Sequence, residues 1–250
     1  MKKVTTNILW VLVAFTLAGC EPSPQGATAV KANPPPHAQT AQAPQAPKAV
    51  PAWFGDSTGV GALEVDLTKK NYYVVLDGSG SMRDRAGGEV KIVAAKKAIS
   101  AFAALVPATA NLGLLAFDGN GITERVPLGT SNRPQFAKRL EEVNADSGTP
   151  LRSAITEAYA RIRAQARKQL GYGEYHLVIV TDGEANGGED PRSIVNKILG
   201  ESTVVIHTIG FDISTNHSLN QRGRTMYRTA ADRAGLEKGL KEVLAEAEKF

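Results

Sequence analysis

The chain has 250 residues, of which 42% are hydrophobic, and a formal charge of +4 at pH 7. So mild a positive excess argues neither for nor against nucleic-acid binding, and we expect no nucleic-acid partner. Its single cysteine, Cys20, excludes an internal disulfide framework.

The first 19 residues are typical of an export signal peptide. Lys2 and Lys3 precede an apolar stretch over residues 8–17, which is too short to span a bilayer. Leu17-Ala18-Gly19-Cys20 resembles the lipobox of bacterial lipoproteins, whose cysteine is lipidated and becomes the first residue after cleavage. We therefore expect a lipid on Cys20 and a mature charge of +2, because Lys2 and Lys3 are removed. A free structural thiol is the alternative.

Residues 20–59 are expected to form a tether. Eight prolines lie between positions 22 and 51 among Ala, Gln and Ser, with almost no large apolar residue, so this stretch cannot bury a core. A spacer is favoured over a ligand for a proline-recognition module. Leu63, Val65 and Leu67 then alternate with polar residues, which is typical of an edge strand. We place one domain over residues 60–250, a length that suits a single core.

Within that domain, continuous apolar runs alternate with helical patterns. Buried strands are predicted over residues 72–76, 112–117, 177–180 and 204–209, with a further strand over 225–229. Helices are predicted over 92–106, 133–143, 151–162, 191–199 and 236–249, with Lys91 off the apolar stripe of the first. This alternation predicts a single-domain α/β fold with a doubly wound, mostly parallel sheet flanked by helices on both faces.

An aspartate follows each of the first four predicted strands. Asp77, Asp118, Asp182 and Asp212 should therefore lie on one rim, at the carboxyl ends of the strands, where ligands bind in such sheets. The sequence does not say which of them meet. For Asp118 and Asp212, a turn is favoured over a contribution to a site.

Three loops on this rim carry oxygen donors. They are Asp77, Ser79 and Ser81 after the first strand, Thr149 before a helix, and Asp182 after a later strand. Each loop alone also has a plain structural explanation, such as a flexible turn or, for Thr149 before Pro150, a helix N-cap. Carboxylate and hydroxyl oxygens are hard ligands, which suit Mg²⁺, Mn²⁺ or Ca²⁺ and not zinc or copper.

Together these residues resemble the metal-ion-dependent adhesion site of von Willebrand factor A domains, whose pattern is Asp-x-Ser-x-Ser, then Thr, then Asp. The resemblance covers residues 70–250 and implies that Ser79, Ser81 and Thr149 bind the ion directly. Asp77 and Asp182 would bind it directly or through water. It also implies that the ion, most readily Mg²⁺, binds an Asp or Glu carboxylate of a protein partner.

The expected function is therefore a non-enzymatic, lipid-anchored binding module of the cell envelope. It would face the periplasm from an outer membrane if the host has two membranes, and otherwise lie on the outer face of the plasma membrane. One alternative is a metal-dependent hydrolase or phosphoryl-transfer enzyme using Asp77, although Ser79 stands where such an enzyme needs a second acid. Another is that the metal only staples the loops together.

Overall fold

Six strands form one sheet in the computed structural model, which describes residues 52–56 and 60–247. In sheet order the strands are β5 (Gly121–Gly129), β4 (Asn111–Asp118), β1 (Lys70–Asp77), β6 (Glu174–Thr181), β7 (Val205–Phe211) and β8 (Met226–Ala230). A short hairpin of β2 (Arg85–Ala86) and β3 (Glu89–Val90) follows the 3-10 helix η1 (Gly80–Arg83).

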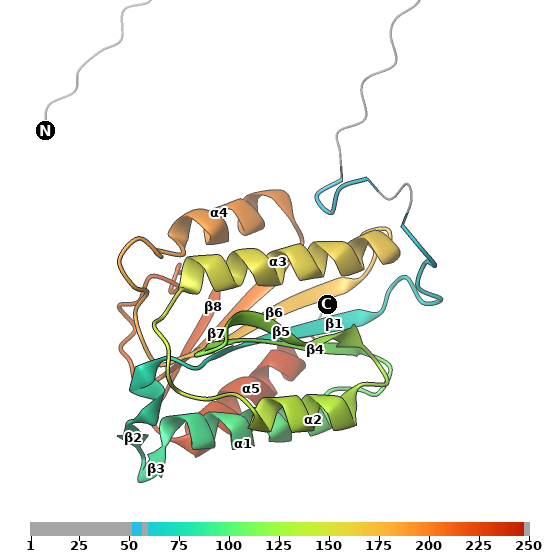
Figure 1. The fold of residues 1–250 in the computed structure, drawn as a ribbon. Coiled ribbons are helices and arrows are strands. Elements are labelled where there is room, and N and C mark those ends of the chain that lie inside the picture. Colours follow the sequence, from blue (N-terminus) through green and yellow to red (C-terminus); the bar gives the residue numbers. More distant parts are fainter. Residues whose placement is uncertain (1–51, 57–59, 248–250) are drawn as a thin grey trace, which may run out of the picture. The chain divides into compact units, whose positions relative to one another are not determined.

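Helices cover both faces of the sheet, as the alternating pattern predicts (Figure 1). The helices α3 (Leu151–Lys168) and α4 (Arg192–Glu201) lie on one face, and α1 (Lys91–Leu105), α2 (Arg133–Glu141) and α5 (Arg233–Ala247) on the other. The predicted α/β architecture is confirmed. Pro107 follows the end of α1, as expected from a residue that cannot continue a helix.

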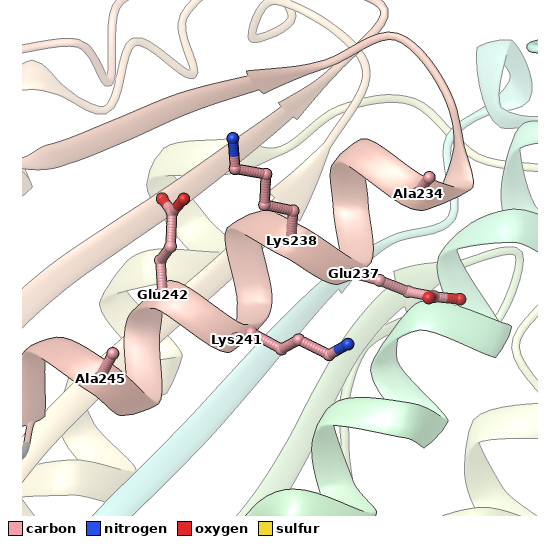
Figure 2. A pocket seen from close by; sticks show the side chains of 6 residues that line it. All are labelled: Ala234, Glu237, Lys238, Lys241, Glu242 and Ala245. Carbon is pink, nitrogen blue, oxygen red and sulfur yellow. The ribbon is translucent and has the colours of Figure 1, made fainter.

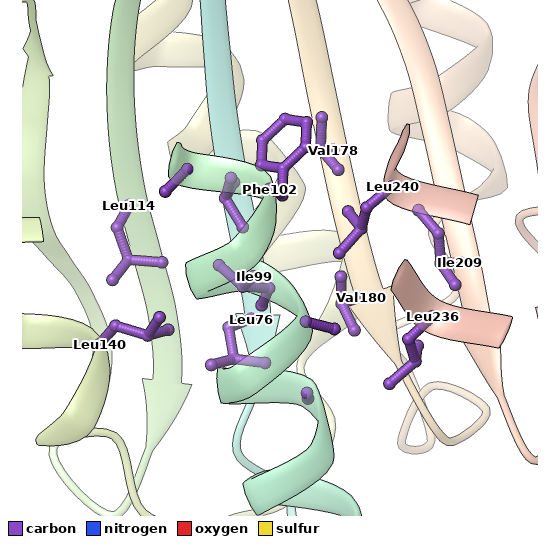
Figure 3. Packing of buried hydrophobic residues seen from close by; sticks show 14 of the residues in the cluster. Leu76, Ile99, Phe102, Leu114, Leu140, Val178, Val180, Ile209, Leu236 and Leu240 are labelled. Atoms are coloured by element: carbon purple, nitrogen blue, oxygen red, sulfur yellow. The ribbon is translucent and has the colours of Figure 1, made fainter. Parts of the chain in front are cut away.

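The central strands are continuously apolar because each face meets a different helical layer. In β1, Tyr72, Val74 and Leu76 point into the core under α1, α2 and α5, whereas Tyr73 and Val75 point into the core under α3 and α4. Figure 3 shows the first of these cores, where side chains of α1, α2 and α5 pack on the strands.

Strand β1 is the position at which the strand order reverses. It pairs in parallel with β4 on one side and with β6 on the other. The carboxyl ends of these strands therefore open onto a shared crevice, where ligands bind in doubly wound sheets. The loops that follow Asp77 and Thr181 both start at this point.

Two sequence expectations are corrected at the edges of the domain. The predicted edge strand around Leu63 and Val65 does not form: Leu63 is 49% exposed and the Val65 side chain is fully exposed. The edge strand that was missed is β5, which pairs antiparallel with β4; polar residues and glycines interrupt its apolar ones, and Val126 is its one buried residue. An edge strand packs on fewer neighbours, so its sequence carries a weaker apolar signal.

Residues 52–56 pack on the domain at the end of the sheet opposite the crevice. The Trp53 ring lies 5.3 Å from that of Tyr175 near the start of β6, and Phe54 lies against Gly171, just after α3. The predicted signal peptide, Cys20 and most of the tether lie outside the described residues. Within the described residues, no helix has the length and apolarity needed to cross a membrane.

Candidate metal centre

The first loop of the candidate site begins at Asp77, the last residue of β1. Its carboxylate is fully buried: Oδ1 accepts the Ser79 backbone N–H at 2.7 Å and Oδ2 accepts the Thr181 hydroxyl at 2.5 Å. Burial raises the pKa of Asp77 to about 6, while the hydrogen bonds from Ser79 and Thr181 act in the opposite direction. Asp77 therefore holds the first loop to the end of β6.

The second loop is tied to the first by main-chain hydrogen bonds. The Gly78 carbonyl accepts the N–H groups of Asp146 and Ser147, and the Gly80 N–H donates to the Ser147 carbonyl at 2.8 Å. Two residues further on, Thr149 is buried, with an exposed fraction of 7%. The capping role considered for Thr149 is not observed, because α3 begins after Pro150 without a side-chain cap.

The third loop brings Asp182 to the serines of the first. Its Oδ1 accepts the Ser81 hydroxyl at 2.7 Å and lies 3.4 Å from the Ser79 hydroxyl, and the two serine oxygens are 3.1 Å apart. The Asn186 N–H donates to the Thr149 carbonyl at 3.0 Å, which ties this loop to the second. All five predicted ligand residues thus lie on three loops that contact one another.

The donor set fits a small hard cation. A Cβ built on Gly183 would lie 3.8 Å from the Ser81 Oγ and 3.9 Å from the Thr149 Oγ1, so both hydroxyls face the same position of the third loop. In residues 52–56 and 60–247, no three His, Cys, Asp or Glu side chains are grouped as metal ligands. An ion held here would therefore depend on the hydroxyls, which favours Mg²⁺, Mn²⁺ or Ca²⁺ over zinc.

Lys91 is the main residue of this region that the sequence analysis did not recognise. It was expected off the apolar stripe of α1, yet it is 6% exposed, and its Nζ lies 3.2 Å from Oδ2 of Asp182 and 3.2 Å from Oδ2 of Asp212. Burial alone would lower the pKa of Lys91, but the hydrogen bonds and charges of the two aspartates outweigh it, so this pKa is raised. A lysine at a helix N-terminus opposes the helix dipole, and that was the available signal.

His217 supports the third loop from outside. Its Nδ1 accepts the Leu219 N–H at 3.1 Å, so Nε2 carries the proton and donates to the Gly183 carbonyl at 3.0 Å. No sequence pattern pointed to His217, because it lies 34 residues from Gly183 along the chain. His217 positions the main chain beside Asp182.

The other candidates on the rim have different partners. The Asp118 carboxylate is engaged by Arg125, whose Nη2 donates to its two oxygens at 2.7 and 2.6 Å. Asp212 reaches the site only through Lys91.

A surface hollow on α5 offers no comparable chemistry. Figure 2 shows the side chains that line it, which are Ala234, Glu237, Lys238, Lys241, Glu242 and Ala245. Acidic and basic groups are mixed along one exposed helix face there, which is typical of a solvated surface. The three loops at the carboxyl end of the sheet therefore stay the candidate site.

The sequence matches a known domain family and a known protein. The model of the von Willebrand factor type A domain matches residues 71–238. The chain is 31% identical over 167 residues to the uncharacterized protein YwmD of Bacillus subtilis (strain 168), across 60% of this chain and 73% of YwmD.

Two solved structures show the same fold. One is the conserved hypothetical protein BatB from Bacteroides thetaiotaomicron, with a TM-score of 0.60, 14% identity, and coverage of 72% of this chain and 100% of BatB. The other is the manganese-loaded TRAP protein of Plasmodium vivax, with a TM-score of 0.53, 20% identity, and coverage of 71% of this chain and 74% of the TRAP chain. The family match, which spans more than half of the sequence, shows that the chain belongs to the von Willebrand factor type A domain family.

Proposed function

We propose that this protein is a lipid-anchored binding module whose domain holds a divalent cation and, through it, an Asp or Glu carboxylate of a protein partner. The observation that carries the proposal is the cluster of Ser79, Ser81 and Asp182, whose oxygens lie within 3.4 Å of one another beside the buried Thr149. The TRAP structure, which has the same fold, is manganese-loaded, and this supports a divalent cation in a domain of this fold.

The five ligand residues would contribute two kinds of oxygen to the ion. Ser79, Ser81 and Thr149 would supply neutral oxygens, and Asp77 and Asp182 the negative charge. When bound, the ion would present a coordination position on the open side of the crevice to an incoming carboxylate. Asp77 keeps the first loop in place through its hydrogen bonds to the Ser79 N–H and the Thr181 hydroxyl.

The described start of the chain packs at the end of the sheet opposite the metal loops. Trp53 and Phe54 pack near the start of β6 and the end of α3, whereas Asp77 and Asp182 lie at the other end of the sheet (Figure 1). An anchor at Cys20 would therefore lead into the domain at the end opposite the metal. We infer a cell-envelope location, at the outer membrane facing the periplasm if the host has two membranes.

We infer a binding role and not an enzymatic one. Asp77 is the candidate nucleophile of the enzyme alternative, but it is fully buried and both of its oxygens accept hydrogen bonds. Position 79 also holds a serine where a general acid would be needed. A purely structural role of the metal is disfavoured as well, because main-chain hydrogen bonds between residues 78–80 and 146–147 already join the first two loops.

The test compares the wild-type chain with Asp182→Ala and, as a matched control, Asp190→Ala. Asp190 is an exposed aspartate on the same loop that pairs with Arg192 and lies away from the serines. Purified protein is titrated with Mn²⁺ by calorimetry and then used to capture envelope proteins in Mg²⁺ or chelator. We expect Asp182→Ala to lose both metal binding and metal-dependent capture, while Asp190→Ala keeps both.

The alternatives give different results. If the metal only holds the loops together, chelation should lower the melting temperature steeply. No protein should then be captured in Mg²⁺ that is not also captured in chelator. If the protein is an enzyme, purified wild type should turn over phosphate or ester substrates and Asp77→Ala should not. Capture of the same proteins with and without metal would contradict the proposal.

A further inference from the structure

The ammonium group of Lys91 is held between two carboxylates at the edge of the candidate metal site. The main-chain N–H of Lys91 donates to the Asp84 carbonyl at 2.9 Å, which fixes the start of α1 against the end of the first loop. Its Nζ lies 3.2 Å from Oδ2 of Asp182, whose side chain is fully buried. Asp182 thus meets a fixed positive charge on one oxygen and the two serine hydroxyls on the other.

This arrangement changes the charge that an incoming cation would meet. Asp77 and Asp182 bring two negative charges, and Lys91 cancels one of them at contact distance. A divalent cation bound beside Ser79 and Ser81 would therefore be only half neutralised by the local charges of Asp77, Asp182 and Lys91. Asp212 lies on the far side of the ammonium, with a side chain 51% exposed to solvent, so water screens its contribution.

Asp212 is held in place by the main chain despite an uncommon conformation. Its φ is 56°, in the left-handed region that residues other than glycine rarely adopt, and its N–H donates to the Ala230 carbonyl at 2.7 Å. The side chain then meets Lys91 from the end of β7. The Lys91 charge is therefore shared between the metal loop and a second strand end.

We propose that Lys91 acts as an internal counter-ion of Asp182, which keeps the divalent cation weakly bound until an anionic ligand from the partner joins it. This inference rests on the function proposed above and deepens it. Lys91 is a positioning residue: it holds Oδ2 of Asp182 so that Oδ1 faces the serines. Because metal and carboxylate each relieve the excess charge left by the other, their binding is cooperative and the coupling is reciprocal.

The experiment titrates Mn²⁺ into the full-length protein in detergent, for wild type, Lys91→Met and Lys91→Arg. Methionine keeps the length of the side chain without its charge, and arginine keeps the charge. We expect Lys91→Met to bind Mn²⁺ about tenfold or more tightly, because repulsion is removed and Asp182 loses its competing partner. Lys91→Arg should stay close to wild type.

A second variant avoids any dependence on the folding of Lys91→Met. Asp212→Asn changes a half-exposed group and leaves the Lys91 charge less compensated, so Mn²⁺ affinity should fall by about threefold. Glu184→Gln is the matched control, since Glu184 is a similarly exposed acid beside Asp182 that does not contact Lys91. It should change affinity less than Asp212→Asn does.

Cooperativity is measured by repeating the titrations in acetate and in chloride at equal ionic strength, with acetate as the carboxylate probe. Acetate should raise the Mn²⁺ affinity of wild type more than that of Lys91→Met. Acetate also binds free Mn²⁺, but this effect is the same for every variant and cancels in the comparison. Weaker or unchanged Mn²⁺ binding in Lys91→Met would overturn this inference alone. Absence of Mn²⁺ binding in wild type would instead overturn the proposed function.

Discussion

Replacing Gly78 by alanine should disrupt the candidate site by steric crowding. A Cβ built on Gly78 would lie 2.4 Å from the Asn144 carbonyl oxygen, 2.7 Å from the Phe117 carbonyl oxygen and 2.9 Å from the Asp118 Cβ. The φ of Gly78 is not positive, so alanine can adopt the backbone conformation and only space is lacking. The two nearest atoms belong to the main chain, and the Phe117 oxygen also accepts the Gly78 N–H at 2.8 Å.

The loss of folding stability in Gly78→Ala depends on how far the first loop must move from the main chain at Phe117 and Asn144. Overpacking in a closely packed site costs about 1–3 kcal/mol, and the lower entropy of the unfolded alanine variant offsets roughly 0.4–1 kcal/mol of that. Because neither carbonyl can rotate away freely, we expect a loss of about 2 kcal/mol. For a domain of this size that lowers the melting temperature by roughly 4–8 °C. Mn²⁺ affinity should fall as well, because the Gly78 carbonyl binds the second loop.

Gly80→Ala in the same loop is the control. A Cβ there would meet Nη2 of Arg83 at 3.2 Å and the Ser147 carbonyl oxygen at 3.8 Å, and the end of an arginine side chain can move aside. Thermal unfolding of both variants, followed by circular dichroism in chelator, measures the difference. Equal melting temperatures for Gly78→Ala and Gly80→Ala would refute the steric argument.

Two further predictions concern buried ionisable groups outside the metal loops. Burial lowers the pKa of His176 to about 4 and that of His207 to about 3, against about 6.5 in an unfolded chain, so stability present above pH 6.5 should fall as pH decreases. At pH 4.5 the loss should be roughly 2 kcal/mol per histidine by urea unfolding, and a His207→Leu variant as acid-sensitive as wild type would contradict this. Asp118→Asn removes the charge from the buried pair with Arg125 and should cost about 3 kcal/mol, yet leave Mn²⁺ affinity within about twofold of wild type. A large loss of affinity would place Asp118 at the metal after all.

The parallel core of the sheet was predictable because its strands are buried on both faces. Continuous apolar runs such as 72–76 and 177–180 leave few alternatives to a central strand, and β1 and β6 contain them. The edges were not predictable in this way. Leu63 and Val65 alternate with polar residues but pair with no strand, whereas β5 forms because β4 offers it a free edge, not because its own residues are apolar.

The sequence by itself determined the candidate donors of the site. Asp77, Ser79 and Ser81 directly follow a predicted strand and Asp182 follows a later one, so the rule that parallel strands end on one rim connects them. Such a rule works without side-chain detail, because it depends only on the direction of the strands. Thr149 was added by the resemblance to the adhesion-site pattern.

Only the tertiary structure decided which charged groups act on those donors. It pairs Asp118 with Arg125 and brings Lys91 between Asp182 and Asp212. These pairings depend on packing between segments that are far apart in the chain, and the choice among several possible partners is made by distances of a few ångströms. A one-dimensional pattern contains no such distances, whereas electrostatic energy depends directly on them.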